Sequence, residues 1–303
     1  HRDLHLSIRR QRQMCIRDRV PRYTSNSELG TIIRTPYYYA LSPYKDLTIE
    51  PMYISGQRPL MYAQYRQRFS NGELGIEGSF TNAERRTRVA TYSNKTRGHL
   101  FINGKFDHND FWRYGFNVKR STDDTYLSRY MFSGATDRLH SDFFIEGFDD
   151  RNYFYATGIA TQVQSSTYES RKTPLVLPSI NYNYQSEKTK IGFVDFNASF
   201  LSLTRRQGAD TRKVSLQPII TYPFQDNFGN RFKLQAKTTL TSYMVSHVKR
   251  TDKMDFKGIK HRVHPELLFG WDLPLRKFQN ESTFILKPQA ALILAPNRGA
   301  DPD

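Results

Sequence analysis

Hydrophobic and polar residues alternate with a period of two along most of the chain, as they do in β-strands with one apolar and one polar face. In the stretch "ELGIEGSF", Leu74, Ile76 and Phe80 fall on one face, and Glu73 and Glu77 fall on the other. No helical stripe of comparable length interrupts this pattern. The sequence therefore predicts an all-β, antiparallel protein. The same alternation is found in residues 99–106, 111–120, 231–240 and 262–273.

Strand length and charge distinguish two all-β architectures. Soluble sandwiches and barrels have strands of about 5–6 residues, whereas transmembrane barrels have strands of about 9–11 residues with the apolar face outward. Here the alternation often continues for about 10 residues, which matches the second class. The polar face also carries repeated full charges, as at Arg231, Lys233 and Lys237. A water-filled lumen tolerates such a row but a dry core does not, so a transmembrane β-barrel is favoured over the soluble alternative.

The composition is compatible with a transmembrane barrel, and the net charge indicates an anionic partner. The chain has 303 residues, 38% of them hydrophobic, and a mean hydropathy of −0.68. It contains no apolar run of about 18 residues, which excludes a spanning helix but not a spanning barrel. The net charge of +16 points to an anionic partner, with nucleic acid and phosphorylated lipid as the two candidates.

Residues 1–19 differ from the remainder of the chain. They carry six Arg and two Asp and show neither strand alternation nor a helical stripe. We expect this segment to be a non-native or disordered leader. The only cysteine, Cys15, lies within it, so no disulfide is expected in the folded part.

Five stretches resemble, in the same order, segments of the LPS-assembly outer-membrane protein family, LptD. They are "TPYYYALSPYKDLTIEPMYIS", "EGFDDRNYF", "PLVLPSINYNY", "SFLSLTRRQGADTRKVSLQP" and "LKPQAALILAPN". The resemblance implies a transmembrane β-barrel of the bacterial outer membrane that releases lipopolysaccharide sideways into the outer leaflet, in contact with the membrane lipid and without a chemical reaction. It also implies two protein partners, an LptE-like lipoprotein that plugs the lumen and a periplasmic bridge that delivers lipopolysaccharide to a jellyroll domain.

The resemblance also implies a division of the chain. Residues 20–34 correspond to the end of the periplasmic domain or to a linker, and residues 35–303 to roughly the first half of a large barrel. The rest of the jellyroll has no counterpart in the sequence. We therefore expect an internal fragment of a longer protein.

Three prolines lie in the first strongly β-like segment, although proline gives no N–H to a sheet. From the residues alone, Pro36, Pro43 and Pro51 are expected at turns and strand ends. The resemblance implies instead that Pro36 and Pro51 weaken a lateral gate between the first and last strands, while Pro43 lies in the turn between the first two.

Basic residues predicted on the polar face form the second candidate site. Arg and Lys bind phosphates and acidic sugars well, so this face is expected to interact collectively with lipopolysaccharide. The alternative is that the charges keep a wide lumen hydrated or pair with carboxylates such as Glu266. The face comprises Arg66, Arg68, Lys105, Arg113, Lys119, Lys213, Arg231, Lys233, Lys237 and Arg262.

We predict no catalytic residue, cofactor or metal site. His261 and His264 are three apart, so a strand directs them to opposite faces. Glu146, Asp149 and Asp150 in "EGFDDR" are expected to form a turn with Arg151 as a partner, rather than a set of paired catalytic carboxylates.

Two other functions remain as alternatives, a passive outer-membrane channel or receptor, and a soluble basic β-protein that binds anionic glycan or nucleic acid. A nucleic-acid partner is disfavoured because it calls for aromatic and basic residues on one face. Here they alternate to opposite faces.

Overall fold

The structure, a computed structural model, describes residues 20–27, 29–86, 91–132, 134–164, 170–249, 255–279 and 282–296. Antiparallel strands make up nearly all of these residues, which confirms the all-β prediction. The chain divides into two compact units, His1–Phe144 with Ile159–Thr173, and Ile145–Gly158 with Pro174–Asp303. The expected leader, residues 1–19, lies outside the described residues, and the division predicted after residue 34 stays a prediction.

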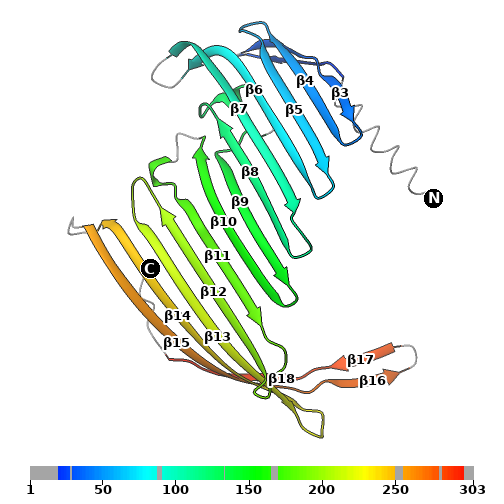
Figure 1. The fold of residues 1–303 in the computed structure, drawn as a ribbon, viewed down its shortest axis with the longest axis vertical. Coiled ribbons are helices and arrows are strands. Elements are labelled where there is room, and N and C mark those ends of the chain that lie inside the picture. Colours follow the sequence, from blue (N-terminus) through cyan, green and yellow to red (C-terminus); the bar gives the residue numbers. More distant parts are fainter. Residues whose placement is uncertain are drawn as a thin grey trace. The chain divides into compact units, whose positions relative to one another are not determined.

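The first unit is built from strands that pair in the order β1-β2-β4-β5-β6-β7-β8, with β3 also paired to β4 (Figure 1). Most neighbours in this order are consecutive in sequence, so the sheet is a meander of hairpins. The strands are β1 (Arg22–Asn26), β2 (Gly30–Arg34), β3 (Tyr37–Ser42), β4 (Lys45–Ile54), β5 (Leu60–Phe69), β6 (Gly72–Arg86), β7 (Thr91–Asp107) and β8 (Trp112–Ser121).

The second unit continues the same pattern in the order β11-β12-β13-β14-β15-β18. Its last part departs from the meander. After β15 the chain forms a separate two-stranded ribbon of β16 and β17, and it then returns to pair β18 with β15 (Figure 1). The strands are β11 (Leu175–Gln185), β12 (Phe193–Thr204), β13 (Asp210–Gln225), β14 (Arg231–Lys249), β15 (Asp255–Asp272), β16 (Leu275–Gln279), β17 (Ser282–Leu286) and β18 (Gln289–Leu294).

A hairpin of β9 (Arg138–Asp149) and β10 (Asn152–Val163) contributes residues to both units. Its tip belongs to the second unit and its open end to the first. The 3-10 turn η1 (Ser170–Lys172) follows it.

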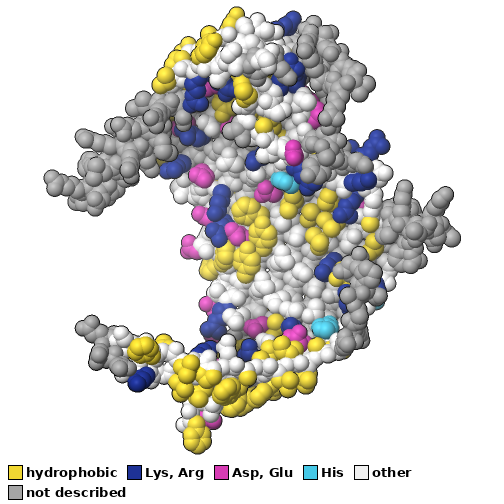
Figure 2. Space-filling model, turned by 180° about the vertical axis from the view of Figure 1, so that it is seen from behind, with side chains coloured by type: hydrophobic (Ala, Val, Ile, Leu, Met, Phe, Trp, Pro, Cys, Tyr) yellow, Lys and Arg dark blue, Asp and Glu magenta, His cyan; other side chains and the backbone are white. Residues whose placement is uncertain are grey.

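The register gives each sheet the two faces that the alternation predicts. In the first unit Ile76 pairs with Ile102, and Phe80 and Leu100 lie on the same face with exposed fractions of 63% and 45%. Figure 2 shows hydrophobic side chains gathered on one side of the strands of the second unit, in the lower part of the view. Large apolar side chains exposed in such numbers indicate a surface that contacts an apolar environment.

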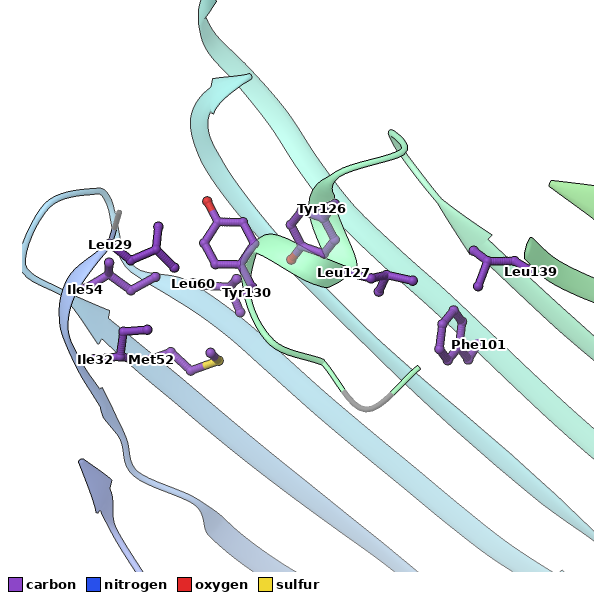
Figure 3. Close-up of a cluster of buried hydrophobic side chains, with 10 residues drawn as sticks. All are labelled: Leu29, Ile32, Met52, Ile54, Leu60, Phe101, Tyr126, Leu127, Tyr130 and Leu139. Carbon is purple, nitrogen blue, oxygen red and sulfur yellow. The ribbon is translucent and has the colours of Figure 1, made fainter. Parts of the chain in front are cut away.

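A buried cluster lies on the polar face of the first unit, at the end where β8 connects to β9. The connection contains the short helix α2 (Tyr126–Arg129), which lies against β7, and Tyr130 after it lies near Leu29 and Leu60 (Figure 3). We call residues 122–132 the cap. No helix of the described residues is long and apolar enough to cross a membrane. The cluster comprises Leu29, Ile32, Met52, Ile54, Leu60, Phe101, Tyr126, Leu127, Tyr130 and Leu139.

Candidate functional site

Strands β2 and β3 are two halves of one interrupted strand. Both pair with β4, and the register is the same on either side of the break, since Arg34 pairs with Met52 and Tyr37 pairs with Ile49. Thr35 and Pro36 fall in the gap between the halves. In this register Pro36 is opposite Glu50, and Thr35 is opposite Pro51. The structure therefore brings the two predicted gate prolines to adjacent cross-strand positions.

The two prolines remove donors from opposite sides of this edge. The N–H of Thr35 donates to the carbonyl of Pro51 over 3.2 Å. In an antiparallel ladder, such a pair normally exchanges two hydrogen bonds, but Pro51 has no N–H with which to form the second. Because bonded and non-bonded pairs alternate, the nitrogen of Pro36 points away from β4, toward the outer edge.

The pairing of the outer edge also changes at Thr35 and Pro36. Strand β1 covers β2 and pairs Arg22 with Arg34 at the end of its ladder. Beyond the break, the described residues give β3 no partner other than β4. Pro36 thus marks the border between a paired and an unpaired edge. Pro43 lies in the turn between β3 and β4, as predicted.

Charged groups surround the break on the polar face. The guanidinium of Arg34 lies 3.8 Å from the carboxylate of Glu50 and donates to the carbonyl of Tyr130 over 2.9 Å. Tyr130 belongs to the cap, and its hydroxyl donates to Gln57 over 2.8 Å. The cap is therefore tied both to β2 and to the turn between β4 and β5.

A buried ion pair holds the other side of the cap. The side chain of Arg97 on β7 is 1% exposed and donates to both oxygens of Asp123, each over 2.8 Å. Burial alone would raise the pKa of Asp123, but hydrogen bonds from Arg97 and Thr125 outweigh it and lower the pKa to about 2. Asp123 therefore stays ionised at neutral pH.

The cap was not predicted from the sequence. Its segment, "TDDTYLSRYMF", shows neither strand alternation nor a helical stripe. Its one recognisable signal is the density of aromatic residues. Ser79 ties these residues to the sheet, since its hydroxyl lies 2.6 Å from that of Tyr126 and 2.7 Å from Nδ1 of His99.

The basic residues predicted on the polar face do share one face within each unit. In the first unit the register places Arg66 beside Gly75, Arg68 beside Glu73, and Lys105 beside Glu73 on the next strand. Arg66 forms a two-bond ion pair with Asp46, at 3.0 and 3.1 Å. The same registers put Arg113 and Lys119 on this face through their neighbours on β7.

In the second unit, carboxylates compensate part of the basic face. Nζ of Lys237 lies 2.8 Å from Glu266, a carboxylate that the sequence suggested as a partner of the basic face, and Arg231 donates to Asp272 over 3.0 Å. Lys213 instead lies over the ring of Tyr243, 5.1 Å from its centroid. Lys233 and Arg262 share the face with these residues. The role of the face in binding lipopolysaccharide stays a prediction.

The two histidines are placed as the sequence indicated, and the acidic segment only in part. His261 pairs with Ser242 and His264 with Thr239, so the two histidines lie on opposite faces of β15. Asp150 occupies the turn between β9 and β10, and Arg151 lies 3.8 Å from its carboxylate. Glu146 and Asp149, also expected in this turn, belong instead to β9, because the strand continues to Asp149.

Long antiparallel strands with an exposed apolar face and a charged face define the class of β-proteins that span outer membranes. Within this class, residues 95–301 match the family model LptD, described as LPS transport system D. The chain belongs to this family. Membership confirms the predicted fold class, an antiparallel transmembrane β-barrel of which this chain carries a part.

Curated relatives agree with the family model. The "LPS-assembly protein LptD" of Sodalis glossinidius is 23% identical, over 92% of this chain and 37% of its own length. Its namesakes in Idiomarina loihiensis and Escherichia coli K12 are 26% and 23% identical, over 68% and 87% of this chain and 27% and 35% of their own lengths. The chain thus spans about a third of the curated relatives it matches.

One solved structure, titled "Bacterial polysaccharide outer membrane secretin", aligns with 88% of this chain and 81% of its own at 14% identity. Its TM-score is 0.32, too low to support an argument about shared architecture.

Proposed function

We propose that this chain is part of an outer-membrane barrel that transports lipopolysaccharide into the outer leaflet and carries out no chemical reaction. Family membership supports this proposal, as do relatives whose name is "LPS-assembly protein LptD". The exposed apolar face suits the bilayer, and the charged face suits a hydrated lumen through which phosphorylated sugars pass.

The observation that carries the proposal is the break at Thr35 and Pro36. A lipid that leaves a barrel sideways needs a seam where few backbone bonds must part. The Thr35–Pro51 pair has one bond in place of two, and Pro36 withholds a donor from the outer edge. Each lost bond weakens pairing by about 0.5–1.5 kcal/mol. The gate then opens at β3, where Pro36 withholds a donor from the strand that closes the barrel and Pro51 loosens the attachment to β4 behind it.

The partners belong to the same proposal. Lipopolysaccharide contacts the basic face collectively, an LptE-like lipoprotein fills the lumen, and a periplasmic bridge supplies the lipid from the side of residues 20–34. The cap fits such a path, because its hydrogen bonds link β2 to the turn between β4 and β5. These bonds hold the strand that contains the break in a fixed position.

Replacing Pro36 and Pro51 together by Ala in the full-length protein tests the gate. The variant regains donors on both sides of the edge strand, so lipopolysaccharide at the cell surface should fall in cells that depend on this variant. Pro43→Ala is the matched control, because Pro43 lies in a turn and its replacement adds no bond to the seam. Normal surface lipopolysaccharide in the double variant would refute the proposed gate.

A further inference from the structure

Four strands of the second unit carry a continuous row of hydrogen-bonded neutral side chains. Asn183 on β11 donates to Asn197 on β12 over 2.7 Å, and Asn197 donates to Gln217 on β13 over 3.2 Å. Gln217 in turn donates to Thr239 on β14 over 2.9 Å. The register places all four at one level of the sheet and on its polar face. We call this row the amide ladder.

The ladder forms the floor of a concavity of about 490 Å³. Its lining contains no charged side chain, although the polar face of the same unit carries Lys213 on one side of the row and Lys237 with Glu266 on the other. The lining includes Tyr153 and Tyr155, whose rings are nearly parallel, with centroids 6.4 Å apart. The lining residues are Tyr153, Tyr155, Asn181, Asn183, Asn197, Ala198, Ser199, Ser215 and Gln217.

The ladder orients its amides and leaves part of their hydrogen-bonding capacity for a ligand. An amide side chain has two N–H donors and an oxygen with two lone pairs. Each bond of the ladder uses one N–H of its donor, so Asn183, Asn197 and Gln217 each keep a second N–H. Ser199 and Ser215 add hydroxyl groups beside them. The floor thus offers donors and acceptors in alternation, without net charge.

We propose that this concavity is a binding site for uncharged saccharide units. Sugar hydroxyls both donate and accept, which matches a floor of amides and hydroxyls, and the apolar C–H faces of a sugar ring suit a tyrosine ring. Phosphates and carboxylates would find no cation in the lining. The inference deepens the proposed function and rests on it in one respect: the saccharide would be the neutral part of the transported lipid.

Binding of maltohexaose, a neutral probe, to the full-length protein in a detergent without a sugar head group tests the inference. We expect saturable binding that is unchanged when salt rises from about 50 to 500 mM, because no ion pair is involved. Asn197→Leu removes the centre of the ladder and should weaken binding about tenfold, equivalent to 1.4 kcal/mol. Tyr155→Leu leaves the ladder intact and should also weaken binding.

Gln235→Leu is the matched control. Gln235 is an amide on the same face of β14, bonded to Thr221 over 3.0 Å, and it does not line the concavity. This variant should bind maltohexaose normally. Equal loss in Gln235→Leu and Asn197→Leu would overturn the inference, and so would absence of binding by the unmodified protein. Stronger, salt-dependent binding of hexagalacturonate, an anionic probe, would overturn it as well.

Maltohexaose binding and the proline variants together distinguish a failure of the saccharide site from a failure of the proposed function. Failure to bind maltohexaose, with normal dependence of surface lipopolysaccharide on the gate prolines, refutes the saccharide site alone. Binding of maltohexaose, with surface lipopolysaccharide indifferent to Pro36 and Pro51, refutes the gate and leaves the site. If the lumenal lipoprotein cross-links to position 197 and excludes the sugar, the concavity is a protein interface and the inference fails.

Discussion

The N–H of Thr35 donates to the carbonyl of Pro51 over 3.2 Å, and Pro51 has no N–H to give in return. The same alternation has a second consequence for Pro51. Its nitrogen faces β3 rather than β5, so its pairing with Met61 on β5 loses no hydrogen bond. One proline thus weakens the outer edge strand without weakening the sheet behind it.

Pro51→Ala should strengthen the pairing of β3 with β4, whereas Pro36→Ala should not. The first substitution would supply the missing donor to Thr35 and add about 0.5–1.5 kcal/mol to the local stability. The nitrogen at position 36 points away from β4, so its N–H would reach only the outer edge. Hydrogen exchange of residues 37–42 measures the difference, and it should slow about 2–10-fold in the first variant alone.

Equal protection in the two variants would contradict the assigned direction of the two nitrogens. Pro43→Ala serves again as the control, because it lies outside the paired segment. It should leave the exchange of residues 37–42 unchanged.

Breaking the ion pair between Arg97 and Asp123 should release the cap. Arg97→Met would leave a carboxylate buried without its main partner, which typically costs about 3–5 kcal/mol. Hydrogen exchange at residues 126–130 should then rise sharply, while exchange in β5 and β6 changes little. Arg120→Met is the control, because Arg120 is an exposed residue of the neighbouring strand β8. A cap that stays protected in Arg97→Met would show that its apolar contacts suffice.

Acid should weaken the cap between about pH 4 and pH 2. The pKa of Asp123 is lowered from 3.8 to about 2 in the folded protein, so its ionised form contributes stability above pH 4. That contribution is lost as the pH falls through the folded pKa. Hydrogen exchange of residues 126–130, corrected for the intrinsic rate, should reveal the transition. In Asp123→Asn the transition should be absent, and an unchanged transition would assign it to another group.

The sequence predicted the strands well because a period of two is a local property. Leu74, Ile76 and Phe80 share a face in any strand that contains them, whatever the strand pairs with. The positions of the basic residues follow from the same rule, and so does the separation of His261 and His264.

The features that the sequence did not reveal depend on pairing between distant residues. The cap has no periodicity and is held by partners such as Arg97, 26 residues from Asp123. Asn183, Asn197 and Gln217 look like ordinary polar-face residues until the register aligns them. The prolines stand out in the sequence, but the direction in which each nitrogen points is decided by the alternation of bonded pairs, which only the register gives.

Lys213 and Lys237 should contribute unequally to the binding of lipopolysaccharide. Both lie on the polar face of the second unit, but Glu266 lies 2.8 Å from Lys237 and compensates its charge, whereas Lys213 lies over the ring of Tyr243. Lys213→Gln should therefore weaken binding to the full-length protein by about three- to tenfold at low salt, a range that corresponds to about 0.7–1.4 kcal/mol. Lys237→Gln should weaken it less.

Titrations with purified lipopolysaccharide at two salt concentrations provide the measurement, and the difference should shrink at high salt. Lys188→Gln, in the exposed turn between β11 and β12, controls for the change in net charge. Equal effects of all three substitutions would mean that net charge, and not the arrangement of the polar face, governs binding.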